Sequence, residues 1–141
     1  MTTQASDITS IIASTLGRFG RYLVSAGKNH FVSDQRVAVG GPGEAVTAGE
    51  LLLASLGSCS LGLIEKTALE SGILLTGGSS EVSFKRDETD PTRYEWIRIE
   101  VRLSGVSPAE AEALVAGFTS RCPIYNTLKR GGPIDISWKV N

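Results

Sequence analysis

Two cysteines, Cys59 and Cys122, are the residues of this 141-residue chain whose type allows redox chemistry. A cysteine thiolate is a nucleophile, and its sulfur can be oxidised to a sulfenic acid or joined in a disulfide. One histidine and two cysteines cannot fill a four-coordinate zinc site, so we expect no structural metal and no other cofactor.

Cys59 falls in the middle of a predicted helix, on one stripe with Leu56 and Leu63. It could be a small core residue, since free cysteine is among the most buried residue types. Its small neighbours leave room and polarity beside the sulfur, which favours a chemical role: Ser55, Ser58, Ser60 and Gly62. Position alone leaves both interpretations open.

Cys122 precedes Pro123 at a predicted helix start, where free amide groups and the helix dipole favour a thiolate. It could equally be a cap residue without a chemical role. No spacing rule links the two cysteines, so the sequence does not establish that they touch.

The other ionisable candidates are two arginines, a glutamate and the single histidine. Arg18 and Arg21 are predicted on the first strand, where a guanidinium could stabilise a thiolate or face solvent. Glu50 is expected to form a capping box with a helix-start threonine, and His30 is expected at a surface strand start.

The elements that must position these side chains follow from periodicity and turn chemistry. Residues 16–37 predict a strand pair with a turn at 26–29. The capping box Thr47–Glu50 then starts a helix that runs through Leu51 to about Ser71 and ends at Gly72. Because that helix is apolar on nearly every side, we expect it to be a buried central helix.

The second half of the chain predicts three strands and two helices. Strands are predicted at 81–86 and 97–103, and a closing strand at 134–140, because apolar and polar residues alternate there. A capping box at Ser107–Glu110 starts a helix that ends near Arg121, and a short helix follows at 123–129. The pattern predicts an α+β fold with an antiparallel sheet covered by helices on one face.

Length and composition fit one globular domain over residues 1–141, with residues 1–15 as an N-terminal extension. With 14 basic and 15 acidic side chains, the net charge is −1, so we expect no nucleic-acid partner. No apolar stretch is expected to approach the roughly 18 residues of a membrane span, and the N-terminus lacks a signal pattern. We therefore expect a cytoplasmic protein, because the N-terminus has no signal pattern. In the cytoplasm, paired cysteines are more often catalytic or redox-sensing than structural.

Two cysteine motifs resemble the signature of the OsmC/Ohr peroxidases. The first comprises Gly41-Pro42-Gly43 and the run Gly49–Cys59, and the second is Arg121–Leu128. The stretch Asn29–Asp34 and the closing segment after Gly132 are also similar, so the resemblance covers roughly residues 16 to 140.

The resemblance implies a curved antiparallel sheet wrapping two long central helices in an intertwined homodimer, with sites at the dimer interface. It implies that Cys59 is the peroxidatic thiolate for an organic hydroperoxide and Cys122 the resolving thiol, in stress defence. It also implies an external dithiol reductant, lipoyl-type in Ohr members. The run Gly17–Arg21 resembles the Gly-Arg-x-Gly-Arg of Ohr proteins, which maps the family's catalytic arginine onto Arg18.

The chain departs from the Ohr pattern at one position. The catalytic glutamate of Ohr proteins lies ten residues before the first cysteine, where this chain has Gly49, and Glu50 lies nine before it. One residue turns a helical side chain by about 100°. Two rivals to a two-cysteine peroxidase therefore stay open: a redox sensor or ligand-binding dimer without efficient turnover, and a structural dimer with inert cysteines.

Overall fold

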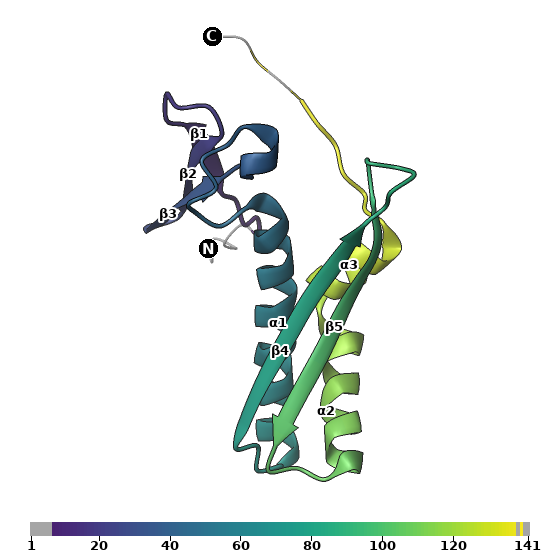
Figure 1. Cartoon of the computed structure of the whole chain (residues 1–141). Coiled ribbons are helices and arrows are strands. Elements are labelled where there is room, and N and C mark those ends of the chain that lie inside the picture. The colour runs from purple at the N-terminus through teal and green to yellow at the C-terminus, as the bar shows by residue number, and fades with distance from the viewer. Residues whose placement is uncertain (1–6, 138, 140–141) are drawn as a thin grey trace. The chain divides into compact units, whose positions relative to one another are not determined.

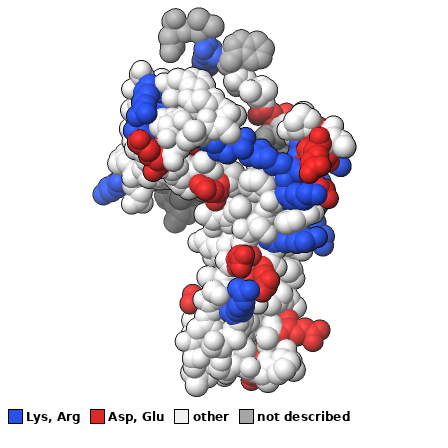
Figure 2. Space-filling view, viewed as in Figure 1, with Lys and Arg blue, Asp and Glu red and all other residues white. Residues whose placement is uncertain are grey.

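A computed structural model describes residues 7–137 and 139 of the chain (Figure 1). The chain forms two compact units, one up to Leu51 and one from Leu52 onward. Groups of strands are followed by groups of helices along the chain, and both sheets are antiparallel, so the predicted α+β class is confirmed. On the face shown in Figure 2, acidic and basic side chains lie in small mixed groups between stretches of uncharged surface.

The first unit is built on a three-stranded sheet with the order β1-β2-β3. Strands β2 (Arg21–Ala26) and β3 (Asn29–Asp34) form the predicted pair, joined by a turn at Gly27, whose φ of 61° suits glycine. Strand β1 (Ile12–Thr15) was not predicted and pairs with β2. Arg18 lies in the turn between β1 and β2 rather than on a strand, so that part of its predicted placement is wrong.

A short 3-10 helix, η1 (Val37–Val39), leads into the glycine-rich loop and then into α1 (Ala48–Ser71). The predicted capping box is present: the Thr47 amide donates to the Glu50 carboxylate at 2.8 Å, and the Glu50 amide donates to the Thr47 hydroxyl at 3.3 Å. The helix ends at Gly72, whose φ of 65° is the left-handed conformation of a C′ glycine.

The second unit packs the rest of α1 with a hairpin and two further helices (Figure 1). Strands β4 (Gly77–Arg86) and β5 (Tyr94–Ser104) pair over their whole length, and Val82 lies opposite Ile99 on the apolar face. Helix α2 (Pro108–Arg121) begins with the predicted capping box of Ser107 and Glu110, and α3 (Pro123–Arg130) follows it.

The core of the second unit is small. Its buried residues come from α1, α2 and the junction with α3, and β5 side chains pack against them from the hairpin. On α1 the buried positions are four residues apart and form one stripe: Leu56, Ser60, Ile64 and Ala68. Buried Ser60 is satisfied because its hydroxyl donates to the Gly57 carbonyl at 2.7 Å and shares a second hydrogen bond with the Ser80 hydroxyl at 3.0 Å.

In the single chain only 17% of the most apolar window of α1 is buried, so one copy leaves the predicted burial of α1 untested. Two other expectations drawn from apolar patterns are wrong. By length and composition α1 could also cross a membrane, contrary to the expectation that no stretch approaches that limit, although core helices of soluble proteins pass the same test.

The predicted closing strand is the second wrong expectation. Residues 134–137 form no strand, and Ile134 and Ile136 are 93% and 90% exposed. Trp138 and Val140, which belong to the same prediction, lie outside the described residues. Alternation predicts a strand only where a neighbouring edge supplies hydrogen bonds, and no described strand pairs with this segment.

Candidate active site

The second unit brings the two cysteines together. Cys59 is half-buried on α1, and Cys122 is fully buried where α2 gives way to α3. Both thiols are free, and the two side chains interact within the same apolar cluster. Two thiols in contact are the arrangement from which a disulfide can form after one sulfur is oxidised.

Cys122 is held by the start of α3, as the sequence predicts. It is the N-cap of that helix, and its Sγ accepts a hydrogen bond from the Tyr125 amide at 3.3 Å. The Asn126 side-chain amide donates to the carbonyls of Cys122 and Thr119, at 2.9 and 3.0 Å, and so ties α3 to the end of α2. The sulfur therefore lies at the positive end of a helix dipole.

Cys59 has a different electrostatic setting. Burial raises the pKa of its thiol to about 11, and the neighbouring Cys122 sulfur adds to the rise. At neutral pH this environment keeps the thiol protonated. A cation close to the sulfur would be needed to lower the pKa and provide the nucleophilic thiolate.

Helices α1 and α2 approach each other closely at Gly117. A Cβ atom on Gly117 would lie 2.4 Å from the Thr67 hydroxyl oxygen, so only glycine lets the helices approach this far. Arg121, the residue before Cys122, donates to Thr67 and pairs with Glu70 at 3.0 Å. This contact was not predicted from the sequence. The only feature of the sequence that could have indicated it is Gly117, a glycine inside a helical pattern.

The ion pairs of the first unit centre on Arg21. Its guanidinium donates twice to buried Asp34, at 2.8 Å each, and once to Glu44 at 2.8 Å. These bonds hold the pKa of Asp34 at about 2, and Asp34 also accepts from the backbone amides of Glu44 and Ala45. Arg21 is therefore a structural residue that fixes the glycine-rich loop to β3.

Arg18 remains an exposed guanidinium in the turn before β2. The pKa of Glu44 is lowered mainly by its hydrogen bond from Arg21, and the positive charge of Arg18 adds to this effect. Glu50 is occupied by the capping box. Both residues belong to the first unit, so their predicted roles beside Cys59 remain predictions.

The other polar residues that the structure describes do not form a catalytic or metal-binding group. His30 is an exposed residue of β3 whose ring nitrogen hydrogen-bonds the Ser25 hydroxyl at 2.8 Å, as expected for a surface position. Across residues 7–137 and 139, no three His, Cys, Asp or Glu side chains gather closely enough to hold a metal ion.

Comparison with known proteins identifies the family. The family model described as OsmC-like protein matches residues 41–137, which is more than half of the chain and includes both cysteines. The chain belongs to the OsmC-like family. Members of the OsmC/Ohr group are known for peroxidase-like activity. No curated protein sequence matches this OsmC-like protein.

Solved structures of related proteins share the fold. An organic hydroperoxide resistance protein OsmC from Legionella pneumophila is 28% identical, with 91% of this chain and 93% of that chain covered and a TM-score of 0.67. The organic hydroperoxide resistance protein OhrB of Bacillus subtilis is 24% identical, with coverages of 90% and 93% and a TM-score of 0.64. An OsmC-like protein from Mycoplasma pneumoniae is 18% identical, with 89% of each chain covered and a TM-score of 0.75.

Proposed function

We propose that this OsmC-like protein is a thiol peroxidase that reduces organic hydroperoxides in stress defence, with Cys59 as the peroxidatic and Cys122 as the resolving cysteine. The observation that carries the proposal is the contact between the chain's only two cysteines, both free, in the core of the second unit. Membership of the OsmC-like family and the similarity to hydroperoxide resistance proteins support the same chemistry.

The reaction has three steps. The Cys59 thiolate attacks the terminal oxygen of the hydroperoxide, so an S–O bond forms, the O–O bond breaks and the leaving alkoxide departs as an alcohol after taking a proton. The Cys122 sulfur then attacks the sulfenic acid, the S–S bond forms, and the hydroxyl group leaves as water. An external dithiol, of the lipoyl type by resemblance, restores both thiols by two exchange steps and is itself oxidised to a disulfide.

Variants of the two cysteines test this assignment. We expect Cys59→Ser to lose dithiol-dependent peroxide consumption, and Cys122→Ser to oxidise at Cys59 without forming an intramolecular disulfide, as read from intact mass. Ser58→Ala, which changes an exposed neighbour on α1, is the matched control and should keep full activity. Peroxide consumption that survives Cys59→Ser would overturn the proposal.

Arg18 is proposed as the cation that this thiolate needs. Without such a cation, the environment of Cys59 raises its pKa to about 11. In a Cys122→Ser background, the alkylation rate of Cys59 should level off near neutral pH when Arg18 is present. In Arg18→Met the rate should keep rising toward pH 11. Identical pH profiles for the two proteins would exclude Arg18 from this role.

A homodimer is proposed as the working form. In the single chain much of α1 is uncovered, and Ile134 and Ile136 are almost fully exposed. Exposed apolar surface on this scale is typical of protein interfaces. OsmC-like proteins are small soluble domains, so we propose that a second copy, rather than lipid, covers α1, and that the protein is cytoplasmic. Light scattering at working concentration should give twice the chain mass, and a monomer would contradict the assembly.

A redox sensor or ligand-binding dimer without efficient turnover is the second candidate. Two observations favour it: the raised pKa of Cys59, and Gly49 at the position of the Ohr glutamate. Stopped-flow oxidation of Cys59 by a bulky organic hydroperoxide separates the two. A rate well above that of a free thiol favours the peroxidase, and a rate no faster favours the sensor.

A further inference from the structure

Cys122 is the single residue that joins α2 to α3, and both helices fix its backbone. It is the C-cap of α2, where its amide donates to the Phe118 carbonyl at 3.0 Å. It is also the N-cap of α3, where its carbonyl accepts from the Asn126 amide at 3.0 Å and its sulfur accepts from the Tyr125 amide at 3.3 Å. The direction of the Cys122 side chain therefore follows the angle between the two helices.

Pro123 leaves one carbonyl of α2 without its regular donor. In an α-helix each carbonyl accepts from the amide four residues later. For Thr119 that residue is Pro123, which has no amide hydrogen. The side-chain amide of Asn126 fills this place, because it donates to the Thr119 carbonyl at 3.0 Å and to the Cys122 carbonyl at 2.9 Å. Asn126 therefore bridges the last turn of α2 and the first turn of α3.

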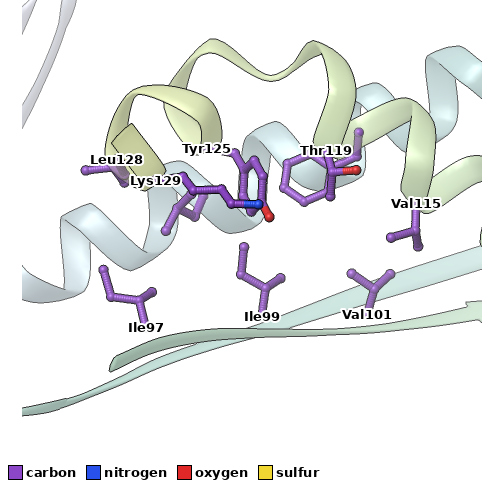
Figure 3. A pocket seen from close by; sticks show the side chains of 10 residues that line it. Ile97, Ile99, Val101, Val115, Thr119, Tyr125, Leu128 and Lys129 are labelled. Atoms are coloured by element: carbon purple, nitrogen blue, oxygen red, sulfur yellow. The ribbon is translucent and has the colours of Figure 1, made fainter. Parts of the chain in front are cut away.

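On the side that faces β5, α3 borders an apolar groove of about 480 Å³. Figure 3 shows Tyr125 and Leu128 on the helix side of this groove, and Ile97 and Ile99 across it on β5. Because this space separates the two sets of side chains, close packing against β5 does not fix the angle of α3.

A ring contact and a hydrogen bond join the side chains of α3 to α2. The ring of Tyr125 packs against that of Phe118, with 5.3 Å between their centres, but apolar packing is not directional. The bond from Asn126 to Thr119 is the only side-chain hydrogen bond between the two helices among the described residues. Since a hydrogen bond weakens steeply when it is bent, this bond restricts the angle between α2 and α3.

We propose that Asn126 is a positioning residue for the resolving step and holds the Cys122 sulfur in place for attack on oxidised Cys59. The inference rests on the proposed function, since it concerns the second step of that reaction. The deprotonated Cys122 sulfur attacks the sulfenic acid sulfur, the S–S bond forms, the S–O bond breaks, and the released hydroxide takes a proton to become water. The attack needs these three atoms in line, and a displacement of about 1 Å in such a geometry costs about a hundredfold in rate.

Asn126→Leu removes the bridge, because leucine has a similar size and branching and donates no hydrogen bond. The reduced protein is mixed with cumene hydroperoxide, and quenched-flow mass spectrometry follows first the sulfenic acid and then the disulfide. Disulfide formation should slow by about tenfold or more, and formation of the sulfenic acid should keep its rate. Thr127→Ala, which changes an exposed neighbour on α3, is the matched control and should alter neither step.

Asn126→His is the conservative variant. The histidine Nδ1 is the same number of bonds from the backbone as the asparagine Nδ2, so its N–H can donate to the Thr119 carbonyl. Most of the lost rate should return in this variant. If Asn126→Leu does not fold, Asn126→Ser takes its place, because the shorter hydroxyl does not reach Thr119, and the same slowing is expected.

A second readout needs no peroxide. Cys122 is fully buried, so iodoacetamide modifies it only when α3 moves away from α2. In a Cys59→Ser background, Asn126→Leu should raise the alkylation rate of Cys122 about tenfold, because the lost hydrogen bonds make this opening more frequent. Thr127→Ala should leave the rate unchanged. Equal alkylation rates in Asn126→Leu and its parent would contradict the bridge.

Disulfide formation at the wild-type rate in Asn126→Leu would overturn the proposal, and so would an equal slowing of both steps or no recovery in Asn126→His. Failure of the proposed function would look different, because Cys59 of the wild-type chain would not react with cumene hydroperoxide. Diamide, which is reduced to a hydrazine as two thiols join in a disulfide, would then measure the same approach of the two sulfurs. The role of Asn126 stands only if Asn126→Leu slows that reaction about tenfold as well.

Discussion

Gly117→Ala tests whether the contact between α1 and α2 determines the stability of the second unit. The new Cβ atom would meet three atoms of Thr67, at 2.4 Å from Oγ1, 2.8 Å from Cγ2 and 3.1 Å from Cβ. Thr67 cannot simply rotate away, because its hydroxyl donates to the Leu63 carbonyl at 2.7 Å and accepts from Arg121. The helices must therefore separate, or these hydrogen bonds must break.

The expected change in the free energy of unfolding is the sum of opposing contributions. Overpacking costs about 1–3 kcal/mol, and loss of a Thr67 hydrogen bond costs about 1 kcal/mol. The higher helix propensity of alanine returns about 1 kcal/mol. We expect the free energy of unfolding to fall by about 1–3 kcal/mol.

Urea denaturation at one fixed protein concentration measures the change, since the stability of an oligomer depends on concentration. Gly62→Ala is the control for the contact within one chain, because a Cβ there meets no atom of the same chain within 4 Å. It should stabilise the protein by about 0.5–1 kcal/mol. Adding Thr67→Ala to Gly117→Ala should restore much of the loss. If Gly117→Ala stabilised the protein as Gly62→Ala does, the close contact between the helices would be refuted.

Two further predictions concern the same chain. Arg121→Met should slow the conversion of oxidised Cys59 to the disulfide, because Arg121 is next to Cys122 and hydrogen-bonds to Thr67 and Glu70 on α1. Quenched-flow mass spectrometry measures the rate of disulfide formation. An unchanged rate would exclude a positioning role for Arg121. Asp34→Asn should destabilise the protein at pH 7, and the difference should shrink as pH falls from about 4 to about 2. Folding lowers the pKa of Asp34 from 3.8 to about 2. The ionised carboxylate therefore stabilises the fold above pH 3.8, and this stabilisation is lost as the carboxylate is protonated near pH 2. A difference in unfolding free energy between the two proteins that stays constant with pH would contradict this.

Local chemistry made the helices predictable. Capping boxes at Thr47 and Ser107 are contacts within four residues, and Gly72 ends α1 through its own backbone conformation. Cys122 at the start of α3 was found in the same way. Each of these features depends only on residues close together in the sequence, so all the interacting groups can be identified from the sequence alone.

Features that depend on distant partners were not predictable. Alternation at 134–137 resembles that of β5, but β5 has β4 opposite it and this segment has no described partner strand. Likewise, Arg21 looks like Arg18 in sequence, and only the fold brings Asp34 and Glu44 to Arg21. The interaction between Cys59 and Cys122 joins residues far apart in the chain, and no spacing rule provides it.

The incomplete features of the single chain share one physical cause. Much of the hydrocarbon surface of α1 remains exposed, and the segment at 134–137 has no partner strand among the described residues. The pKa of Cys59 is raised, and none of the causes found among the described residues is a cation. Each needs a surface that the second unit does not supply from its own residues. Burial of α1 by a second copy would raise the pKa of Cys59 further unless the covering surface also brought a positive charge. The proposed dimer and the proposed role of Arg18 therefore depend on each other, because covering this helix without a guanidinium would leave the thiol inert.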